Sequence, residues 1–441
     1  MKRRLFLQAG PAAAGLALVG CGGAGGGGAD AATGVTANPT AGAPGSAARN
    51  AVDGPVSYPF GSRLDAYVAG IRPTSAIPAD MDHHIRACYD AWKAGAIVDV
   101  PSIPGGKAVR FGTSGAYLTV SEGMGYGMLI TVLMAGHDPQ AQAIFDGMLK
   151  TVRMRHAYSI PASAGGRYLM DWRLTLDGSS TDAAGGGWNG MDGDLDIAMA
   201  LLMADRQWGS SGTWNYLQEG IRTIDAIAAW NMKPDGTTQG MATPNVSRTS
   251  DYMIGHFRAF KRATGDSLWD RAVHRSYWLV DHMQRNFSPH CGLMPDFIVN
   301  TDTDNPIPSP GGMGDFVDTE GHYFANAQRN PWRYASDYVT SGDSRWGDVC
   351  RKLVEFIERD AGGNPASISA GYHLDGHAMS RSYSPEGMIG PMLCGAMVDA
   401  RFQNFCNSLW TWNASNFTTD YYDSELQLLP MIVASGNWWN P

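Results

Sequence analysis

The stretch SEGMGYGMLI, residues 121–130, surrounds one acid, Glu122, with three glycines at the start of an apolar helix. Each glycine inside a helix costs roughly 0.5–1 kcal/mol relative to alanine. The sequence therefore predicts that a bare backbone is needed here, so that a ligand or another part of the chain can approach closely. Ser121 is a natural N-cap, which places Glu122 in the first helical turn.

The neighbours of Glu122 favour a carboxyl group that keeps its proton. Met124 and Tyr126 make the surroundings partly apolar, and such surroundings raise the pKa of a carboxyl group. A protonated carboxyl group beside a substrate oxygen can act as a general acid. The simpler alternative is a glutamate that stabilises the helix dipole, but it does not account for the glycines.

A second set of acids opens the apolar segment 185–208, again after a run of glycines. Asp192, Asp194 and Asp196 lie close together at one helix end, where like charges repel each other. Acids are favoured in a first helical turn, which explains one of the three, and at least one other is expected to be functional. A calcium loop is disfavoured because Ile197 stands where an EF-hand needs glycine.

From about residue 57 onward the composition is globular and indicates one mainly helical domain. Apolar residues recur at helical spacing in four long segments, 194–208, 213–230, 267–287 and 344–360. N-caps are expected at Ser211 and Asp266. The turns TGDSLW (264–269) and SGDSRW (341–346) repeat before two of these segments, which predicts stacked helical hairpins.

The first 56 residues are typical of an export signal followed by a tether. Residues 1–21 resemble a twin-arginine signal that ends in a lipobox, LVGC. Cys21 would then carry a lipid anchor at the membrane, facing the periplasm or the cell exterior; an ordinary cleaved signal is the alternative. Residues 22–56 predict a flexible linker to the domain at 57–441, because they are rich in Gly, Ala and Pro.

Charge and cysteine content limit the possible partners. A formal net charge of −9 and a pI near 5.6 argue against nucleic acid. The cysteines beyond Cys21 form no CxxC pair, which disfavours zinc and redox sites, and an odd set of five is expected to consist mostly of small buried residues. We expect a monomer that contacts the membrane only through its N-terminal anchor.

Five stretches together resemble glycoside hydrolase family 8: SEGMGYGM, DGDLDIAMALLMADRQWG, GLMPDF (292–297), NPWRYASDY (330–338) and the C-terminal SGNWWNP. They follow the family's order from about residue 76 to the C-terminus. The resemblance implies an all-α (α/α)6 barrel with an open substrate cleft. It also implies inverting, endo-acting hydrolysis of β-1,4-linked glucan, xylan or chitosan, without a metal or cofactor.

The resemblance assigns roles to single residues. Glu122 matches the proton donor of the family's S-E-G-x-G-Y-G motif, and the glycines around it are then expected to clear space for a polysaccharide chain to lie against this acid. Asp192 matches the acid that holds the sugar ring at the cleavage point, although Gly190–Met191 replaces the usual Ala-Ser/Thr. Trp172 matches an aromatic residue that stacks on a sugar; without the resemblance it would be interpreted as a core tryptophan.

The general base departs from the cellulase pattern. Asn326 stands where the cellulase and xylanase branch has an aspartate, three residues before Arg329, and an amide cannot accept a proton from water. A second branch, with chitosanases and lichenan-type glucanases, is similar in having Asn there and takes its base from the preceding loop. An Asn/Asp-Phe-aliphatic pattern favours Asp318, and Glu320 is the close alternative. The loop also holds Asp315, and all three could instead be solvated loop acids.

Asp251 is a further departure, because the cellulase branch has a tyrosine near this position. A carboxylate there could contact the ammonium group of glucosamine or a sugar hydroxyl. We expect an endo-β-1,4-glucanase that acts on cellulose-like or mixed-linkage glucan, with chitosanase as the alternative. Asn326 raises another class of function, a surface lipoprotein that binds carbohydrate without cleaving it.

Overall fold

The computed structural model describes residues 56–441 except for the short segments 113–116, 182–185, 241–243, 314–317 and 380–384. The predicted signal with Cys21, the predicted linker up to residue 55 and the loop acid Asp315 lie outside the described residues. The described residues form one compact unit. No helix within the described part is both long enough and apolar enough to cross a membrane.

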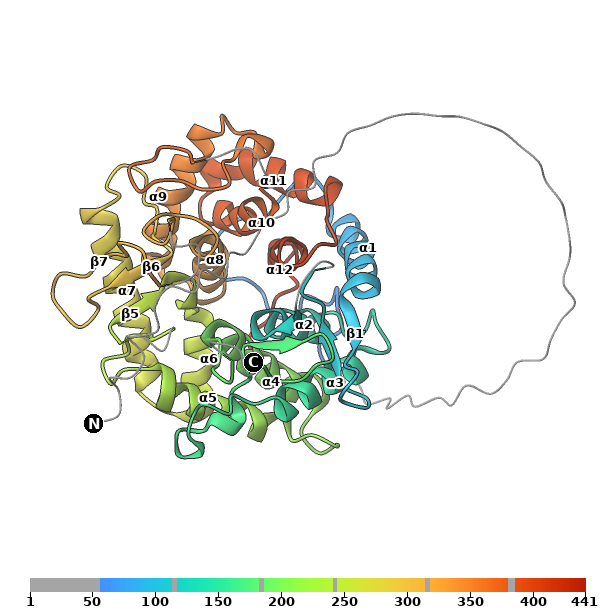
Figure 1. Cartoon of the computed structure of the whole chain (residues 1–441). Helices are drawn as coiled ribbons and strands as arrows, with labels where there is room; N and C mark the ends of the chain where they lie inside the picture. Colours follow the sequence, from blue (N-terminus) through green and yellow to red (C-terminus); the bar gives the residue numbers. More distant parts are fainter. Residues whose placement is uncertain (1–55, 113–116, 182–185, 241–243, 314–317, 380–384) are drawn as a thin grey trace, which may run out of the picture. The chain divides into compact units, whose positions relative to one another are not determined.

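Twelve α-helices, counted within the described residues, form an inner and an outer ring (Figure 1). The inner helices are α2 (Ser121–Leu133), α4 (Met191–Trp208), α6 (Ile254–Thr264), α8 (Asn330–Ser341), α10 (Glu386–Gly395) and α12 (Asp423–Ala434). The outer helices are α1 (Pro78–Ala96), α3 (Ala141–Met154), α5 (Tyr216–Asn231), α7 (Leu268–Asn286), α9 (Ser344–Asp360) and α11 (Gln403–Ser415).

The inner ring closes on itself. Each inner helix contacts the next one along the chain, and α12 contacts α2. The outer helices α3, α5, α7, α9 and α11 each pack on the inner helix that precedes them, whereas α1 packs on α12. A helix covered on all sides must be apolar all round, and in α2 every residue except Glu122 is buried. This is the (α/α)6 barrel that the sequence predicts.

The repeated turns join inner to outer helices, as predicted. Gly265 ends α6 and Gly342 ends α8, with φ angles of +74° and +75°. Glycine is favoured at such left-handed helix ends because it has no Cβ. In the first turn, Asp266 accepts a hydrogen bond from the N–H of Leu268 (2.8 Å), which helps to start α7. The equivalent turn after Gly342 leads directly into α9.

The three predicted helix caps are wrong. The N-cap of α7 is Ser267, one residue after the predicted Asp266. α5 is capped by Asn215, whose side chain accepts from the N–H of Gln218 (2.9 Å), and not by Ser211. Ser121 is the first residue of α2, and the N-cap is Val120, which makes no side-chain cap bond. Ser121 is instead buried against the neighbouring helix α4.

Short antiparallel strands connect the helices on the side where the inner helices begin. The pairs are β1 (Ile97–Asp99) with β2 (Lys107–Val109), β3 (Tyr117–Val120) with β4 (Arg173–Thr175), and β5 (Val246–Arg248), β6 (Phe297–Val299) and β7 (Ile307–Pro308) in one sheet. The prediction of few strands is confirmed. All five described cysteines are buried free thiols, also as predicted: Cys88, Cys291, Cys350, Cys394 and Cys406.

Candidate active site

The glycines of α2 and α4 let the two helices touch backbone to backbone. A Cβ added to Gly125 would lie 2.7 Å from the Cβ of Asp196 and 2.8 Å from the carbonyl oxygen of Gly193. A Cβ added to Gly193 would lie 2.3 Å from the carbonyl carbon of Ser121. Real Cβ atoms do not approach other atoms so closely, so each of these positions requires glycine.

The other two glycines around Glu122 also face protein. A Cβ on Gly123 would lie 2.8 Å from the ring of Tyr421, and one on Gly127 would lie 2.3 Å from Val109. The prediction that these glycines clear space for a polysaccharide chain is wrong, because other parts of the protein fill the space beside all three of them. The glycines bring α4 and Tyr421 against the start of α2, next to the acid.

Arg329 joins the acids that this contact brings together. It ends the short helix η4 (Ala327–Arg329) and is buried. Its Nη1 donates to Oε2 of Glu122 and to Oδ2 of Asp192, the latter at 2.9 Å. Nη1 also lies 3.2 Å from the hydroxyl of Tyr126. One guanidinium group is therefore shared between the two carboxyl groups.

The second guanidinium nitrogen fixes Arg329 to its surroundings. Nη2 donates to the hydroxyl of Ser250 (2.8 Å) and to Oδ1 of Asn326 (2.7 Å). Asn326, predicted at the usual base position, is thus buried and serves here as an acceptor for Arg329. Arg329 and Asn326 were both predicted site residues, and the structure brings them together with Glu122 and Asp192.

Burial and charge move the pKa values of the two acids apart. Glu122, whose side chain is 18% exposed, has its pKa raised to about 7, mainly by burial, while Arg329 opposes the rise. Burial also disfavours the charge on Asp192, but the guanidinium groups of Arg248 and Arg329 hold the pKa of Asp192 well below its usual range. A protonated acid beside an ionised one is the pattern of a general acid with a charged neighbour.

Asp251 belongs to the same group of charged residues, and it lies at the end remote from Glu122. It lies in the short helix η3 (Thr249–Asp251) and is fully buried. Nη2 of Arg248 lies 2.9 Å from Asp192, and Nε of Arg248 lies 3.2 Å from Asp251. Asp251 was predicted to bind substrate; in this structure it contacts Arg248, and the substrate contact stays a prediction.

The comparisons with known proteins agree with this geometry. A model of glycosyl hydrolases family 8 matches residues 104–436. The chain belongs to this family. A β-glucanase from Niallia circulans is 35% identical over 391 residues, which cover 86% of this chain and 91% of that protein. An endoglucanase from Bacillus sp. strain KSM-330 is 34% identical and covers 87% of this chain and 82% of its own.

A solved structure is similar over the same region. The apo structure of a β-1,3-1,4-glucanase from Paenibacillus sp. X4 has a TM-score of 0.81 and 33% identity, and it covers 87% of this chain and 100% of its own. The chain is therefore a family 8 glycoside hydrolase with the barrel fold that the sequence predicted.

Sequence reasoning assigned no role to Tyr421, which contacts Glu122. Its hydroxyl donates to Oε1 of Glu122 at 2.8 Å, and its ring packs on Phe111 with centroids 5.0 Å apart. Gly123 provides the space for that ring. Tyr421 lies 299 positions away in the chain, so no local pattern could have linked it to Glu122.

Asp296 is a second residue without a predicted role, although the motif GLMPDF contains it. It is fully buried, and its carboxylate accepts from the N–H groups of Phe324 (3.1 Å) and Ala327 (2.7 Å) and from the side chain of Asn326 (3.4 Å). It therefore fixes the segment that carries Asn326 and Arg329. The buried acid in a quoted family motif was the signal that could have found it.

The two described candidates for the base differ in their surroundings. Asp318 is exposed, whereas Glu320 is fully buried. Oε2 of Glu320 accepts from the N–H of Met313 (2.9 Å) and from the hydroxyl of Ser309 (3.2 Å). The carbonyl of Glu320 accepts from the N–H of Phe297 (2.9 Å), which pairs with Arg248 across β5 and β6. Glu320 is thereby attached to the sheet that carries Arg248.

Trp172 lies beside the start of α2. Its carbonyl accepts from the N–H of Ser121 (2.8 Å), and Arg173 lies over its ring at 4.5 Å. Trp172 as a whole is half-buried. The predicted stacking on a sugar stays a prediction.

The three acids that open α4 have three different roles. Asp192 is part of the site, whereas Asp194 and Asp196 are completely buried. Asp194 accepts from the N–H of Met170 (2.9 Å) and from Asn189 (2.8 Å), and burial raises the pKa of Asp194 to about 7. The expectation that at least one of these acids is functional stays a prediction.

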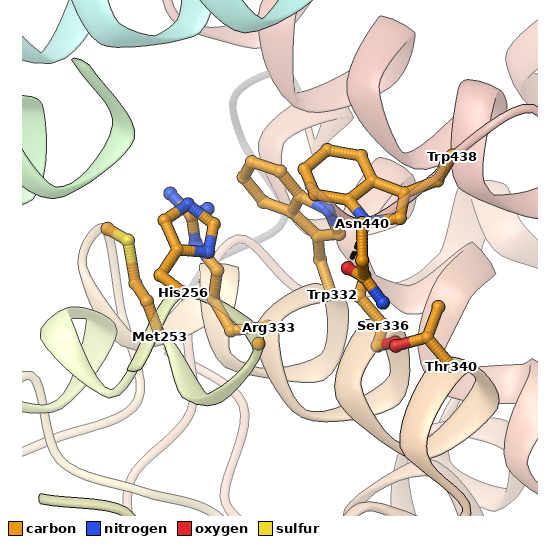
Figure 2. A pocket seen from close by; sticks show the side chains of 9 residues that line it. Met253, His256, Trp332, Arg333, Ser336, Thr340, Trp438 and Asn440 are labelled. Carbon is orange, nitrogen blue, oxygen red and sulfur yellow. Dashed lines mark hydrogen bonds between the residues drawn. The ribbon is translucent and has the colours of Figure 1, made fainter. Parts of the chain in front are cut away.

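Asp196 belongs to a second set of polar residues below the first. Arg333 donates two hydrogen bonds to its carboxylate, at 2.9 and 2.6 Å, and Nε2 of His256 lies 2.7 Å from it. Figure 2 shows His256 and Arg333 in a small pocket that Trp438 and Asn440 also line. The ring of Trp438 stacks on His256, so the C-terminal motif SGNWWNP covers this second set.

Proposed function

We propose that the protein cleaves β-1,4-linked glucan, of the cellulose or mixed-linkage type, within the chain and with inversion at the anomeric carbon. The observation that carries this proposal is Glu122, a partly exposed acid with a pKa raised to about 7 and held between Tyr421 and Arg329. The β-glucanase and endoglucanase names of its relatives support glucan as the substrate.

The proposed reaction is a single displacement. Glu122 gives its proton to the glycosidic oxygen while a carboxylate on the other face of the sugar takes a proton from the attacking water. The water needs space, so the two carboxyl groups are expected to lie roughly 6.5–9.5 Å apart once substrate is bound. Asp192, kept ionised by two guanidinium groups, would accept hydrogen bonds from the sugar hydroxyls at the cleavage point.

We assign the base to Glu320 in preference to Asp318. Glu320 has one carboxylate oxygen held by Met313 and Ser309, and a group fixed in advance needs little reorganisation during the reaction. Asp318 is exposed, and water stabilises an exposed carboxylate in many orientations. The attachment of Glu320 to β6, next to Arg248, also supports the assignment.

The proton donor is tested with Glu122→Gln on carboxymethylcellulose, lichenan and chitosan. We expect wild type to release reducing ends from the glucans and the variant to lose about 10²–10⁴-fold in kcat while it still binds oligosaccharide. Proton NMR of the first products should show new ends in the α configuration. Ends that stay β contradict inversion, preference for chitosan identifies a chitosanase, and no cleavage of any polymer leaves a carbohydrate-binding protein.

The base is tested with Glu320→Gln and Asp318→Asn as a matched pair. We expect the first to lose about 10²–10⁴-fold in kcat and the second to stay near wild type. Azide attacks without giving up a proton, so added azide should restore turnover to Glu320→Gln alone. If only Asp318→Asn loses kcat and only this variant is rescued by azide, Asp318 is the base.

We further propose that the protein is exported through the twin-arginine route and anchored through Cys21. The support is the sequence of residues 1–21 and the tether-like composition of residues 22–56. In an export-competent bacterium fed a labelled fatty acid, wild type should carry the label and sediment with membranes. Cys21→Ala should lose both properties; a labelled Cys21→Ala would contradict the anchor.

A further inference from the structure

Five charged side chains form a continuous row in which acids and guanidinium groups alternate. The order is Glu122, Arg329, Asp192, Arg248 and Asp251. Arg329 contacts Glu122 and lies 2.9 Å from Asp192. Arg248 lies 2.9 Å from the other oxygen of Asp192 and 3.2 Å from Asp251. Each inner member of the row is therefore shared between two opposite charges.

Asp251 ends the row in an unusual way. Its side chain is completely buried, and Oδ2 has no hydrogen-bond partner among the described residues. Gly240 packs directly on this oxygen, since a Cβ added to Gly240 would lie 2.2 Å from it. A buried carboxylate costs free energy unless a charge compensates it. Arg248 forms an ion pair with Asp251, so the charge on Asp251 acts on Arg248.

We propose that Asp251 and Arg248 are positioning residues for the proton donor, because they decide how strongly Asp192 draws Arg329 away from Glu122. The inference rests on the proposed role of Glu122 as the general acid. Neither Asp251 nor Arg248 needs to touch substrate in order to act in this way.

The alternation fixes the sign of each effect. Without the charge on Asp251, Arg248 turns fully to Asp192, and Asp192 holds Arg329 less. Arg329 then lies closer to Glu122, and a nearby positive charge lowers the pKa of a carboxyl group. Loss of Arg248 acts in the opposite direction, because Asp192 is free to hold Arg329 more strongly. The direct effects of the two charges on Glu122 have the same signs.

The other groups that face Glu122 and Asp251 are the same in wild type and in variants of Asp251 or Arg248. Glu122 faces Tyr126 on its own helix, Asp192 of α4, Arg329 of η4, and Tyr421 and Tyr422 before α12. Asp251 faces Arg248, Asp192 and Arg329. The row itself is thus the connection between the two acids.

The test compares Asp251→Asn, Arg248→Met and the double variant. The alkaline limb of the kcat/KM profile reports the general acid of the free enzyme. We expect Asp251→Asn to move this limb down by about half a pH unit or more, and Arg248→Met to move it up by a similar amount. The alkaline limb of the double variant should lie near that of wild type. The double variant still tests the proposal if Arg248→Met alone does not fold.

A titration that needs no activity separates this inference from the proposed function. The Glu122 carboxyl carbon is followed by 13C NMR in each variant, with Glu122→Gln to identify the signal. Shifts of the Glu122 pKa in opposite directions in Asp251→Asn and Arg248→Met support the proposed coupling along the row of charges. If Glu122→Gln stays active, the proposed function fails while this titration still measures the row.

A matched control is Asp337→Asn. Asp337 is buried and paired with Arg258 at 2.8 Å, but it lies eight residues after Arg329, about 12 Å further along the helix. We expect this variant to lose stability and keep the wild-type limb. Equal shifts in Asp337→Asn and Asp251→Asn, shifts of the same sign in Asp251→Asn and Arg248→Met, or no shift in either would each overturn the proposal.

Discussion

Two layers of polar side chains lie one helical turn apart along the same inner helices. The site layer contains Asp192 and Arg329, and the deep layer contains Asp196 and Arg333, each four residues further on. In the site layer one guanidinium group serves two acids. In the deep layer one acid receives both nitrogens of Arg333 and His256 as well. Similar residues at the same spacing are therefore paired in opposite ways.

This difference in pairing goes with a difference in titration. Glu122 in the site layer can change its charge near neutral pH, whereas Asp196 in the deep layer cannot. Burial raises the pKa of Glu122 to about 7, and the shared guanidinium group of Arg329 opposes this rise only in part, so the proton can be released near neutral pH. In the deep layer Arg333 and His256 hold the pKa of Asp196 below its usual value in spite of its burial. The protein loses much stability when a buried charge loses its sole partner. A charge that is shared between two partners keeps the second one.

The largest expected effect tests the deep layer. Asp196→Asn leaves Arg333 buried without its acid, and we expect the free energy of unfolding to fall by about 3–5 kcal/mol. The kcat of the folded fraction should stay close to wild type, because Asp196 is completely buried and paired with Arg333 and His256. Urea denaturation and kinetics below the unfolding transition measure both quantities; unchanged stability would contradict the distinction between the layers.

Asp192→Asn is the matching change in the site layer. We expect roughly a 100-fold loss of kcat, equivalent to about 2.7 kcal/mol, because the amide cannot balance two guanidinium groups. The loss of stability should be smaller than for Asp196→Asn, since Arg329 keeps Glu122 and Arg248 keeps Asp251. Equal losses of stability in Asp192→Asn and Asp196→Asn would show that a guanidinium group shared between two acids does not reduce the loss.

Gly125→Ala sharpens the comparison at the point where α2 meets α4. The added methyl group would meet Asp196 and Gly193 at less than 3 Å, so we expect a loss of about 1–3 kcal/mol in the free energy of unfolding. Gly95→Ala is the matched control, because nothing lies within 4 Å of its Cβ position near the end of α1. Thermal unfolding should show the control unchanged or slightly more stable.

The wild-type pH profile tests the charge of the site layer. Glu122 must be protonated to act as an acid, and its raised pKa places the loss of the proton near pH 7. We therefore expect kcat/KM to fall by roughly tenfold per pH unit above this value. Activity that stays constant to pH 9 would mean that Glu122 is not the donor.

Tyr421→Phe is expected to have the smallest effect. The hydroxyl of Tyr421 stabilises the ionised form of Glu122, so its removal should raise the pKa of Glu122 and move the alkaline limb upward by less than one unit. The pH profile measures the shift. A downward shift would show that Tyr421 orients the carboxyl group more than it stabilises its charge.

The sequence predicted most of the helical architecture because its signals are local. Helical spacing gave the segment 344–360 with both ends in the right place, and the turns at Gly265 and Gly342 join helices as expected. The predicted cap Ser211 failed because another capping residue four positions later, Asn215, begins α5. Ser121 failed because packing against α4 buries it as the first residue of α2.

The site was predictable in its residues but only partly in their connections. Glu122, Asp192 and Arg329 were identified from motifs, yet Asp192 and Asp196 look alike in the sequence, since both open the same helix. Only the partner helices distinguish them. Tyr421 reaches the site from the far end of the chain through ring closure, and no spacing rule relates it to Glu122.

Closure of the ring by its last helix has a consequence for synthesis. α12 contacts α2, and Trp438, which follows α12, stacks on His256. A nascent chain whose final segment is still inside the ribosome has neither Tyr421 beside Glu122 nor the last wall of the barrel. Residues 421–439 must therefore leave the ribosome before the ring can close and Tyr421 can reach Glu122.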